Sequence, residues 1–558
     1  MSTRIFTSTT VLATLILFIA GASGMNLPNP MGIDIDDLGW KRGWSTDQSG
    51  GPWRVGLPQG RWMVLDDYEA VANIGIATGV RIKCLFIMSE FDRSNICANY
   101  PTTTQDGDQW DNSDLVSDDD FVIMDYVKDN AAYIEYGMHG VGHEHWDAQT
   151  HERTRAEWAY ENGDPWPYEE VWGHAECFGL LSAQYGLSYP ISVRNCNASF
   201  YYNPSDTGDT GGLMAGFGVK YATLPVPREY LDDHGLMVIE RGNGVGWSDM
   251  SSAPSSVPST PMMTSHWANF VEPDPADNQT ATNRWITWYN RVKDASDRYA
   301  AKNTVQLYSQ FLYYTYADVS INSGTVSIDN TGMPGWAYDQ EKVGNVLFKH
   351  PLDNGEHISS VDFSGGNISA YYEDRGYGYI VLPMLDRENY SFSYSVGSSE
   401  METYVMLDDG TYNVEAFETW DSDSARVTVE MYGTQNVMVK LTFEPQEVES
   451  ASDDLTLVDW SYAEPVLTMR VRAADVQGST GPINIRSLPA TAVYGPRNFN
   501  EATGKKLRLI SSVDRSGRLN LDLYDLKGVL IRKAYDRNAS GSGHRPSGVY
   551  LYREPAGK

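Results

Sequence analysis

Cysteine is scarce in this sequence, which has only four among 558 residues. No two of them form a Cys-x-x-Cys pair, and this argues against a zinc site built from cysteines. An even number of cysteines is typical of disulfides in exported proteins. Pairing sequence neighbours, Cys84 with Cys97 and Cys177 with Cys196, is the simplest connectivity, so we expect a structural role for them.

Basic residues are also few, with 42 Lys and Arg against 74 Asp and Glu, and the formal net charge is −32. Such a surface repels phosphate backbones, so the sequence argues against a nucleic-acid partner. A hydrophobic fraction of 41% and a charged fraction of 21% are those of an ordinary folded protein. The acidic excess is then explained by solubility.

Long apolar runs are absent after the first 24 residues, and no later segment approaches the roughly 18 apolar residues of a membrane span. The first 24 residues are typical of an export signal, because Arg4 precedes the apolar run VLATLILFIAG and small residues precede Met25. No cysteine follows the expected cleavage site, so a lipid anchor is not indicated. We therefore expect a secreted protein, extracellular or on the surface of a bacterium, with no membrane span.

Residues 25–320 alternate between short apolar runs and helical stretches. VRIKCLFIMSE is typical of a strand, and DDYEAVANIGIAT has helical spacing with Asp66 or Asp67 as an N-cap. Repeated strand-then-helix units predict an α/β fold with a parallel sheet, and their number favours a barrel. We expect its strands at residues 32–37, 80–90, 131–140, 189–196, 235–242 and 261–270, with one more inside 211–226.

The character of the chain changes near residue 321, where long helical patterns end and short alternating runs begin. Residues 321–445 predict a β-sandwich-like accessory module. Residues 446–500 are expected to contain an acidic linker and extra strands. Residues 501–558 predict a small all-β unit with glycine-marked turns.

Three of the predicted strand ends carry groups that can do chemistry. Asp34, Asp36 and Asp37 end the first strand, His139 and His143 follow the third, and His266 follows a late one. Because a barrel of parallel strands gathers its reactive residues at the carboxyl ends, these groups are expected to meet. Two imidazoles and one carboxylate are a common zinc ligand set that leaves room for water and a substrate oxygen.

The segment HGVGHEH has the His-x-x-x-His spacing of helical zinc proteases, but Gly140 stands where their general base would be. Two glycines also disfavour a regular helix, so a loop directly after a strand is the better placement. His145 leaves open which imidazole points inward.

These residues resemble the polysaccharide deacetylase superfamily with its NodB homology domain, over roughly residues 30–310. The matching segments are IDIDDLGW, HGVGH and SHWANF. The resemblance implies a distorted (β/α)7-type barrel in which Asp37, His139 and His143 hold a divalent metal, with zinc expected. It also implies that Asp36 is the base for the attacking water and that His266 is the acid for the leaving group.

The resemblance departs from the family pattern in its middle segments. SVRNCNASFYY offers Arg194 as a positioner of the base and Tyr201 as a substrate contact, but it lacks the family's proline. GVGWSDM matches the tryptophan motif only with Trp247 and Asp249 in inverted order. Tyr201, Trp247 and Trp267 are the expected substrate-binding residues.

The last segment, roughly residues 505–558, resembles the C-terminal sorting domains of the bacterial type IX secretion route. The resemblance lies in LDLYDLKGVLIRKA followed by SGVYLYRE. It implies contact with a secretion machinery, export through the outer membrane and removal of the tail. A plain β-module is the alternative.

Together these features predict a secreted, metal-dependent carbohydrate esterase, a hydrolase that removes N- or O-acetyl groups from an acetylated polysaccharide. Two alternatives stay open at this point. One is a non-catalytic glycan-binding protein on the same scaffold, which the missing Arg-x-Pro pattern and the appended β-modules favour. The other is a glycoside hydrolase or lyase, which needs paired carboxylates in a groove.

Overall fold

The structure is a computed structural model of the chain. It describes residues 24–40, 62–150, 152, 156–159, 164–196, 210–224, 230–231, 235–242, 244–246, 249, 251–322, 324–408, 410–420, 423–487, 498–500, 506–513, 519–525 and 530–535. The chain divides into two compact units, residues 1–444 with 448–484 and residues 445–447 with 485–558.

The first unit contains a closed barrel of seven parallel strands. The neighbours follow the order β2-β3-β4-β5-β7-β8-β1, and β1 also pairs with β2, which closes the ring. The predicted parallel (β/α)7-type barrel is therefore confirmed by the strand order itself. Its strands are β1 (Asn29–Leu38), β2 (Ile82–Ile87), β3 (Ile134–Gly140), β4 (Ser192–Val193), β5 (Tyr221–Leu224), β7 (Met237–Gly242) and β8 (Met262–His266).

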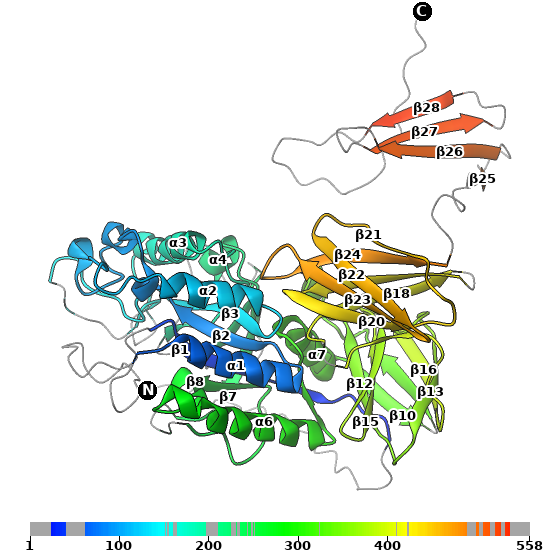
Figure 1. Cartoon of the computed structure of the whole chain (residues 1–558), viewed down its shortest axis with the longest axis horizontal. Coiled ribbons are helices and arrows are strands. Elements are labelled where there is room, and N and C mark those ends of the chain that lie inside the picture. Colours follow the sequence, from blue (N-terminus) through cyan, green and yellow to red (C-terminus); the bar gives the residue numbers. More distant parts are fainter. Residues whose placement is uncertain are drawn as a thin grey trace, which may run out of the picture. The chain divides into compact units, whose positions relative to one another are not determined.

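The barrel strands are buried on both faces, as expected for a parallel sheet that helices cover from outside. Every residue of β2 and β3 is buried. Figure 1 shows α1 and α6 lying outside these strands. The helices of this region are α1 (Leu65–Thr78), α2 (Asp119–Asp129), α3 (Tyr168–Gln184), α4 (Thr210–Gly216), α5 (Trp267–Phe270), α6 (Asn278–Asp294) and α7 (Thr304–Tyr316).

Helix α1 begins one residue before the predicted cap. Its N-cap is Val64, and the Asp67 carboxylate accepts a hydrogen bond from the Val64 backbone N–H at 3.0 Å. The helix ends at Gly79, whose φ of 61° is left-handed and whose N–H bonds to the Gly75 carbonyl. Asp67 therefore caps the helix from its third position instead of from the N-cap.

Two short strands accompany the barrel without entering its ring. β6 (Tyr230–Leu231) pairs antiparallel with β7, and β9 (Arg298–Ala300) pairs parallel with the beginning of β1. None of the helices in the described part of the chain is both long and apolar enough to cross a membrane.

After the barrel, the chain forms mostly antiparallel sheets, as predicted. One has the order β10-β11-β16-β13, with β10 (Asp318–Asn322), β11 (Thr325–Asp329), β16 (Asn389–Gly397) and β13 (His357–Phe363). A larger sheet has the order β12-β15-β14-β17-β20-β23-β22. Its members are β12 (Val346–Pro351), β15 (Tyr377–Leu382), β14 (Ala370–Asp374), β17 (Tyr404–Met406), β20 (Thr434–Lys440), β23 (Val466–Ala473) and β22 (Leu455–Ala463). The short helix α8 (Gly335–Asp339) lies between β11 and β12 in the chain.

Much of the segment expected to be an acidic linker consists of strands. β22 and β23 belong to the larger sheet, and two more strands complete a third sheet with the order β18-β19-β24-β21. That sheet contains β18 (Asn413–Trp420), β19 (Ser424–Met431), β24 (Ser479–Arg486) and β21 (Glu447–Ser450). The backbone of this segment is hydrogen-bonded because β23 pairs with β20 and β24 pairs with β19, two strands that precede residue 445. The domain boundaries themselves stay a prediction.

The second unit contains an antiparallel sheet with the order β25-β26-β27-β28. Its strands are β25 (Asn498–Asn500), β26 (Lys506–Val513), β27 (Leu519–Asp525) and β28 (Leu530–Tyr535). An all-β unit is what the sequence predicts here, and the sorting role stays a prediction.

The expected disulfides between sequence neighbours are wrong for this structure. All four cysteines are free and buried. Cys84 lies in β2, whereas Cys97 belongs to the short 3-10 segment η2 (Ile96–Asn99) beyond the end of that strand. Cys97 instead contacts Cys177 of α3, with their sulfurs 3.8 Å apart. Fold topology, not sequence distance, decides which cysteines meet.

Candidate metal centre

The carboxyl ends of two barrel strands, β1 and β3, bring the predicted metal ligands together. Asp37 lies near the end of β1, and His139 and His143 lie at and just beyond the end of β3. Asp37 Oδ1 is 3.2 Å from His139 Nε2 and 3.6 Å from His143 Nε2. Ligand atoms roughly 2.0–2.1 Å from a tetrahedral zinc ion lie about 3.3 Å apart, so these distances suit a shared cation.

Hydrogen bonds behind the rings orient both imidazoles toward this point. His139 Nδ1 donates to the Arg194 carbonyl at 2.8 Å, which leaves Nε2 as the atom with the lone pair. His143 Nδ1 faces Glu144 Oε1 at 3.4 Å. The side chains of these four residues, His139, His143, Glu144 and Arg194, are all buried.

The Asp37 carboxylate is the observation that tests the fit of a metal. Its Oδ1 is buried and accepts no hydrogen bond of normal geometry from the described residues. Burial acts to raise the pKa of Asp37, but the contact with His139 and the neighbouring His143 and His266 hold it below the ordinary value. An ionised, buried carboxylate oxygen that faces two Nε2 atoms fits a cation.

Cys196 adds a third kind of ligand to the same place. Its sulfur and one nitrogen each of His139 and His143 lie within 4.8 Å of one another, and this buried group could hold a metal ion. The Cys196 sulfur also donates a weak hydrogen bond to the His139 carbonyl at 3.3 Å. Sequence reasoning missed this residue because it was assigned to a disulfide. The signal was its position three residues after β4, at the carboxyl end of a barrel strand.

Asp36 and Arg194, the predicted base and its positioner, form an ion pair between Oδ2 and Nη1. Both side chains are buried, at 2% and 3% exposure. Asp36 Oδ1 has no hydrogen-bond partner among the described residues. Burial, together with the nearby Arg241, lowers the pKa of Arg194. The structure brings this pair together, and the catalytic roles stay predictions.

His266 lies at the end of β8, opposite Asp36 in the register of β1 and β8. Its Nδ1 is buried without a hydrogen-bond partner in the described part of the chain. Burial lowers the pKa of His266 to about 4, a shift that Asp37 opposes and that Arg194 and Arg241 reinforce. The predicted acid is therefore next to the predicted base.

Two of the predicted ligands have unusual backbone conformations. Asp37 has a φ of 66° and His143 a φ of 69°, which is the left-handed region that side chains with a Cβ rarely adopt. Such strain persists only where the surrounding structure enforces it, and it concentrates at functional sites.

The two glycines of HGVGH serve close packing. A Cβ on Gly140 would lie 2.1 Å from Glu157 Oε2, and one on Gly142 would lie 2.0 Å from the Thr103 carbonyl oxygen. Neither glycine has a positive φ. The turn of the loop is made by His143, and the glycines allow other segments to pack against it.

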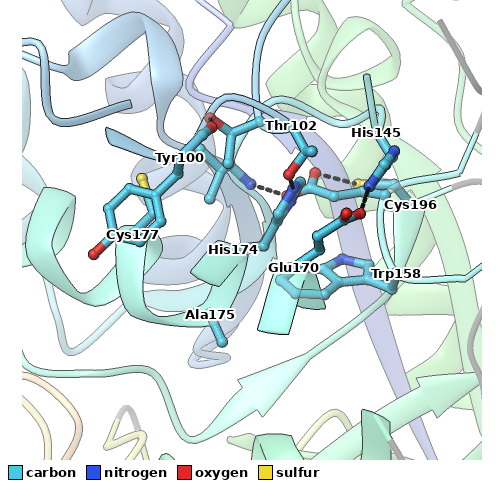
Figure 2. A network of polar contacts seen from close by, with 12 residues as sticks. Tyr100, Thr102, His145, Trp158, Glu170, His174, Ala175, Cys177 and Cys196 are labelled. Atoms are coloured by element: carbon cyan, nitrogen blue, oxygen red, sulfur yellow. Dashed lines mark hydrogen bonds and ion pairs between the residues drawn. The ribbon is translucent and has the colours of Figure 1, made fainter. Parts of the chain in front are cut away.

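A buried network holds this loop from behind. Glu157 Oε1 accepts hydrogen bonds from the Val141 N–H at 2.6 Å and from His174 Nδ1 at 3.0 Å. The Trp158 indole donates to the His139 carbonyl at 2.9 Å. His174 Nε2 lies 2.9 Å from Thr102 Oγ1. Figure 2 shows Thr102, Trp158 and His174 of this network, which come from three segments of the chain. Sequence reasoning missed Glu157 and His174, and no motif marks them.

His145, the third histidine of the segment, points away from the metal ligands. Its Nε2 is 2.7 Å from Glu170 Oε2, and its ring stacks on Trp166 with centroids 3.7 Å apart. Figure 2 shows His145 beside Glu170. Of the imidazoles of His143 and His145, the His143 ring is the one that lies beside Asp37.

The predicted substrate contacts are the least supported part of the site. Trp267 is 1% exposed and packs in the core, so its indole has no open face for a sugar ring. Tyr201 and Trp247 lie outside the described residues.

Comparisons with known proteins give little beyond this geometry. No family model matches the chain, and no curated protein matches it. A crystal structure from Mycobacterium smegmatis, described as a putative polysaccharide deacetylase, is similar at 11% identity. The match covers 42% of this chain and 73% of that one, with a TM-score of 0.25. Because this TM-score is low, the match carries no argument about the fold, and the barrel is established by its strand order alone.

Proposed function

We propose that this protein is a metal-dependent polysaccharide deacetylase that hydrolyses N- or O-acetyl groups. The single observation that carries the proposal is the convergence of Asp37 with His139 and His143 beside the Asp36–Arg194 pair. This convergence lies at the carboxyl end of a parallel barrel, where such folds have their active sites.

Asp37, His139 and His143 are the residues that would hold the metal. Two imidazoles and a carboxylate suit zinc best among common divalent ions and leave coordination positions open. When bound, the ion supplies Lewis-acid polarisation of the acetyl carbonyl and a lower pKa for water. Cys196 is the alternative third ligand, because its sulfur lies near the same two imidazoles.

Asp36 takes the proton from the attacking water. One of its oxygens is held by Arg194, while Oδ1 has no hydrogen-bond partner among the described residues. The ion pair fixes the orientation of the carboxylate and gives it the cationic partner that a buried carboxylate requires. Arg194 is thus a positioning residue for the base.

His266 delivers a proton to the leaving amine or alcohol, a proton that the ring must first take up because burial lowers its pKa to about 4. It is placed for this by the register of β8 against β1, which puts it beside Asp36. Its buried Nδ1 makes no hydrogen bond within the described residues, so the ring retains a nitrogen for a reacting group.

The proposal extends to where the protein acts. An export signal in the first 24 residues and a C-terminal tail similar to type IX sorting domains support a secreted or surface-bound enzyme. Its partner would be an acetylated polysaccharide outside the cell.

The test combines metal analysis of the purified full chain with acetate release from a panel that includes chitin oligomers and acetylated xylan. Acetate release that needs zinc and that is lost in Asp36→Asn supports the proposal. Shortened chains without free acetate would instead identify a glycoside hydrolase or lyase. Binding without any product would identify a glycan-binding protein.

A further inference from the structure

Cys97 and Cys177 lie in van der Waals contact, with sulfurs 3.8 Å apart and no exposed surface on either residue. We propose that these two cysteines form a disulfide when the chain folds under oxidising conditions, and that Cys84 and Cys196 stay free. This bond would join η2 to α3 across 80 residues of sequence.

The geometry requires only a small closure. A disulfide has a sulfur–sulfur distance of about 2.05 Å, so the pair must approach by roughly 1.8 Å, shared between two side chains. Cys196 is engaged elsewhere, because its sulfur bonds to the His139 carbonyl, and Cys84 is buried within β2.

Burial decides when the bond forms. It raises the pKa of the Cys97 thiol well above its ordinary value, so little thiolate is present in the folded protein. Exchange with an external disulfide therefore takes place while the two segments are still accessible, during folding. In the finished structure the same burial protects the bond from reductants.

The chemistry balances with a small-molecule disulfide such as oxidised glutathione as the oxidant. The thiolate of one cysteine attacks the glutathione disulfide, forming a mixed disulfide and releasing one reduced glutathione. The thiolate of the second cysteine then attacks the mixed disulfide and releases the other. Two protein thiols have lost two electrons and two protons, and glutathione has gained them.

The bond would connect two segments that support the metal loop. Five and six residues after Cys97, the Thr102 carbonyl accepts the Trp146 N–H at 2.9 Å and the Thr103 carbonyl packs against Gly142. One turn before Cys177, His174 bonds to Glu157, which holds Val141. Figure 2 shows Cys177 on the helix that also carries His174.

Next to the two sulfurs, the Tyr100 hydroxyl donates to Glu176 Oε2 at 2.8 Å, so the same two segments already meet through a second contact. A disulfide at this junction would restrict the movement of η2 relative to α3 when other parts of the chain unfold locally. Disulfides that close long loops restrict the unfolded chain most strongly.

The test refolds the full chain with reduced and oxidised glutathione and then alkylates it under denaturing conditions. Intact mass is expected to show two of the four thiols blocked from alkylation, and peptide mapping should find a Cys97–Cys177 crosslink. Cys97→Ser and Cys177→Ser should each leave every remaining thiol reactive. The matched control Cys84→Ser should retain the crosslink.

Full alkylation of all four thiols, or a crosslink through Cys84 or Cys196, would overturn the proposal. A second measurement compares oxidised and reduced wild type by the rate of zinc loss to a chelator. Slower loss from the oxidised form is expected, and equal rates would refute the link to the metal loop. Neither measurement depends on deacetylase activity, so failure of the proposed function would be seen separately.

Discussion

His139 Nε2 lies 3.2 Å from Asp37 Oδ1, and the two residues belong to β3 and β1, which are separated in the barrel wall by β2. A hydrogen bond from His139 Nδ1 to the Arg194 carbonyl fixes the orientation of the His139 ring toward Asp37. The pair defines where a cation would bind.

Replacing Asp37 with Ala should remove tightly bound zinc. The variant leaves two imidazoles without their carboxylate, so zinc content measured by elemental analysis should fall from near stoichiometric to near zero. The exposed Asp125, which pairs with Lys128 on the surface of α2, provides the control Asp125→Asn. Retention of zinc in Asp37→Ala would point to Cys196 as the third ligand.

Asp36→Asn should keep the metal and lose the reaction. The amide preserves the size of the side chain but cannot accept the proton, so kcat should fall by roughly 10²–10⁴-fold. Zinc content and the melting temperature are measured beside acetate release. Full activity in this variant with zinc bound would contradict the assigned base.

Gly140→Ala should disrupt the metal loop without touching a ligand. The new Cβ would lie 2.1 Å from Glu157 Oε2, and such overpacking costs about 1–3 kcal/mol. Chemical denaturation gives the free energy of unfolding. Gly216→Ala is the control, because a Cβ there meets nothing within 4 Å. Equal stability of the two variants would show that Glu157 can move aside.

Glu157→Ala should weaken zinc binding although the residue contacts no metal. The Val141 N–H and His174 would both lose their acceptor, and losses behind a metal ligand typically reduce affinity by about 10–100-fold. Competition with a chelator measures the affinity. Glu169→Gln, at an exposed position in the first turn of α3, should change nothing.

Glu415 should make stability depend on pH. Burial, with repulsion from Glu430, raises the pKa of Glu415 from 4.5 to about 7. Below pH 4.5 the carboxyl is protonated in both states. Between pH 4.5 and 7 only the unfolded chain releases the proton, so the free energy of unfolding falls as pH rises, and the loss is complete above pH 7.

The measurement is urea denaturation across this pH range. Glu415→Gln should flatten the part of the slope that belongs to this residue, so its stability relative to wild type should rise with pH. Glu418→Gln, on an exposed position of the same strand β18, is the control. A pH-independent difference between Glu415→Gln and wild type would contradict the shifted pKa.

The sequence was sufficient for the barrel and for the meeting of Asp37, His139 and His143, because strand-then-helix periodicity places strand ends together. The contact between Asp36 and Arg194 was expected only from the resemblance to the deacetylase family, and the structure brings the two residues together. Asp37, His139 and His143 each lie at or near the end of a predicted strand, and that position can be read from the sequence pattern.

Glu157, His174 and the partner of Cys97 could not be predicted in the same way. Glu157 lies in an irregular segment, and its importance comes from the backbone N–H of Val141, which carries no sequence signal. Cys97 meets Cys177 because η2 folds back onto α3, a tertiary contact that spacing does not encode. The sequence marks Gly140 as a residue that disfavours a helix, but its packing against Glu157 is a tertiary contact that the sequence does not show.

The strand β1 lies between β8 and β2 in the barrel wall, although it is the first strand of the chain. The barrel therefore cannot close until residues 262–266 have been synthesised and β8 has paired with β1. Long-range pairing of this kind slows folding and leaves an unsealed edge for longer.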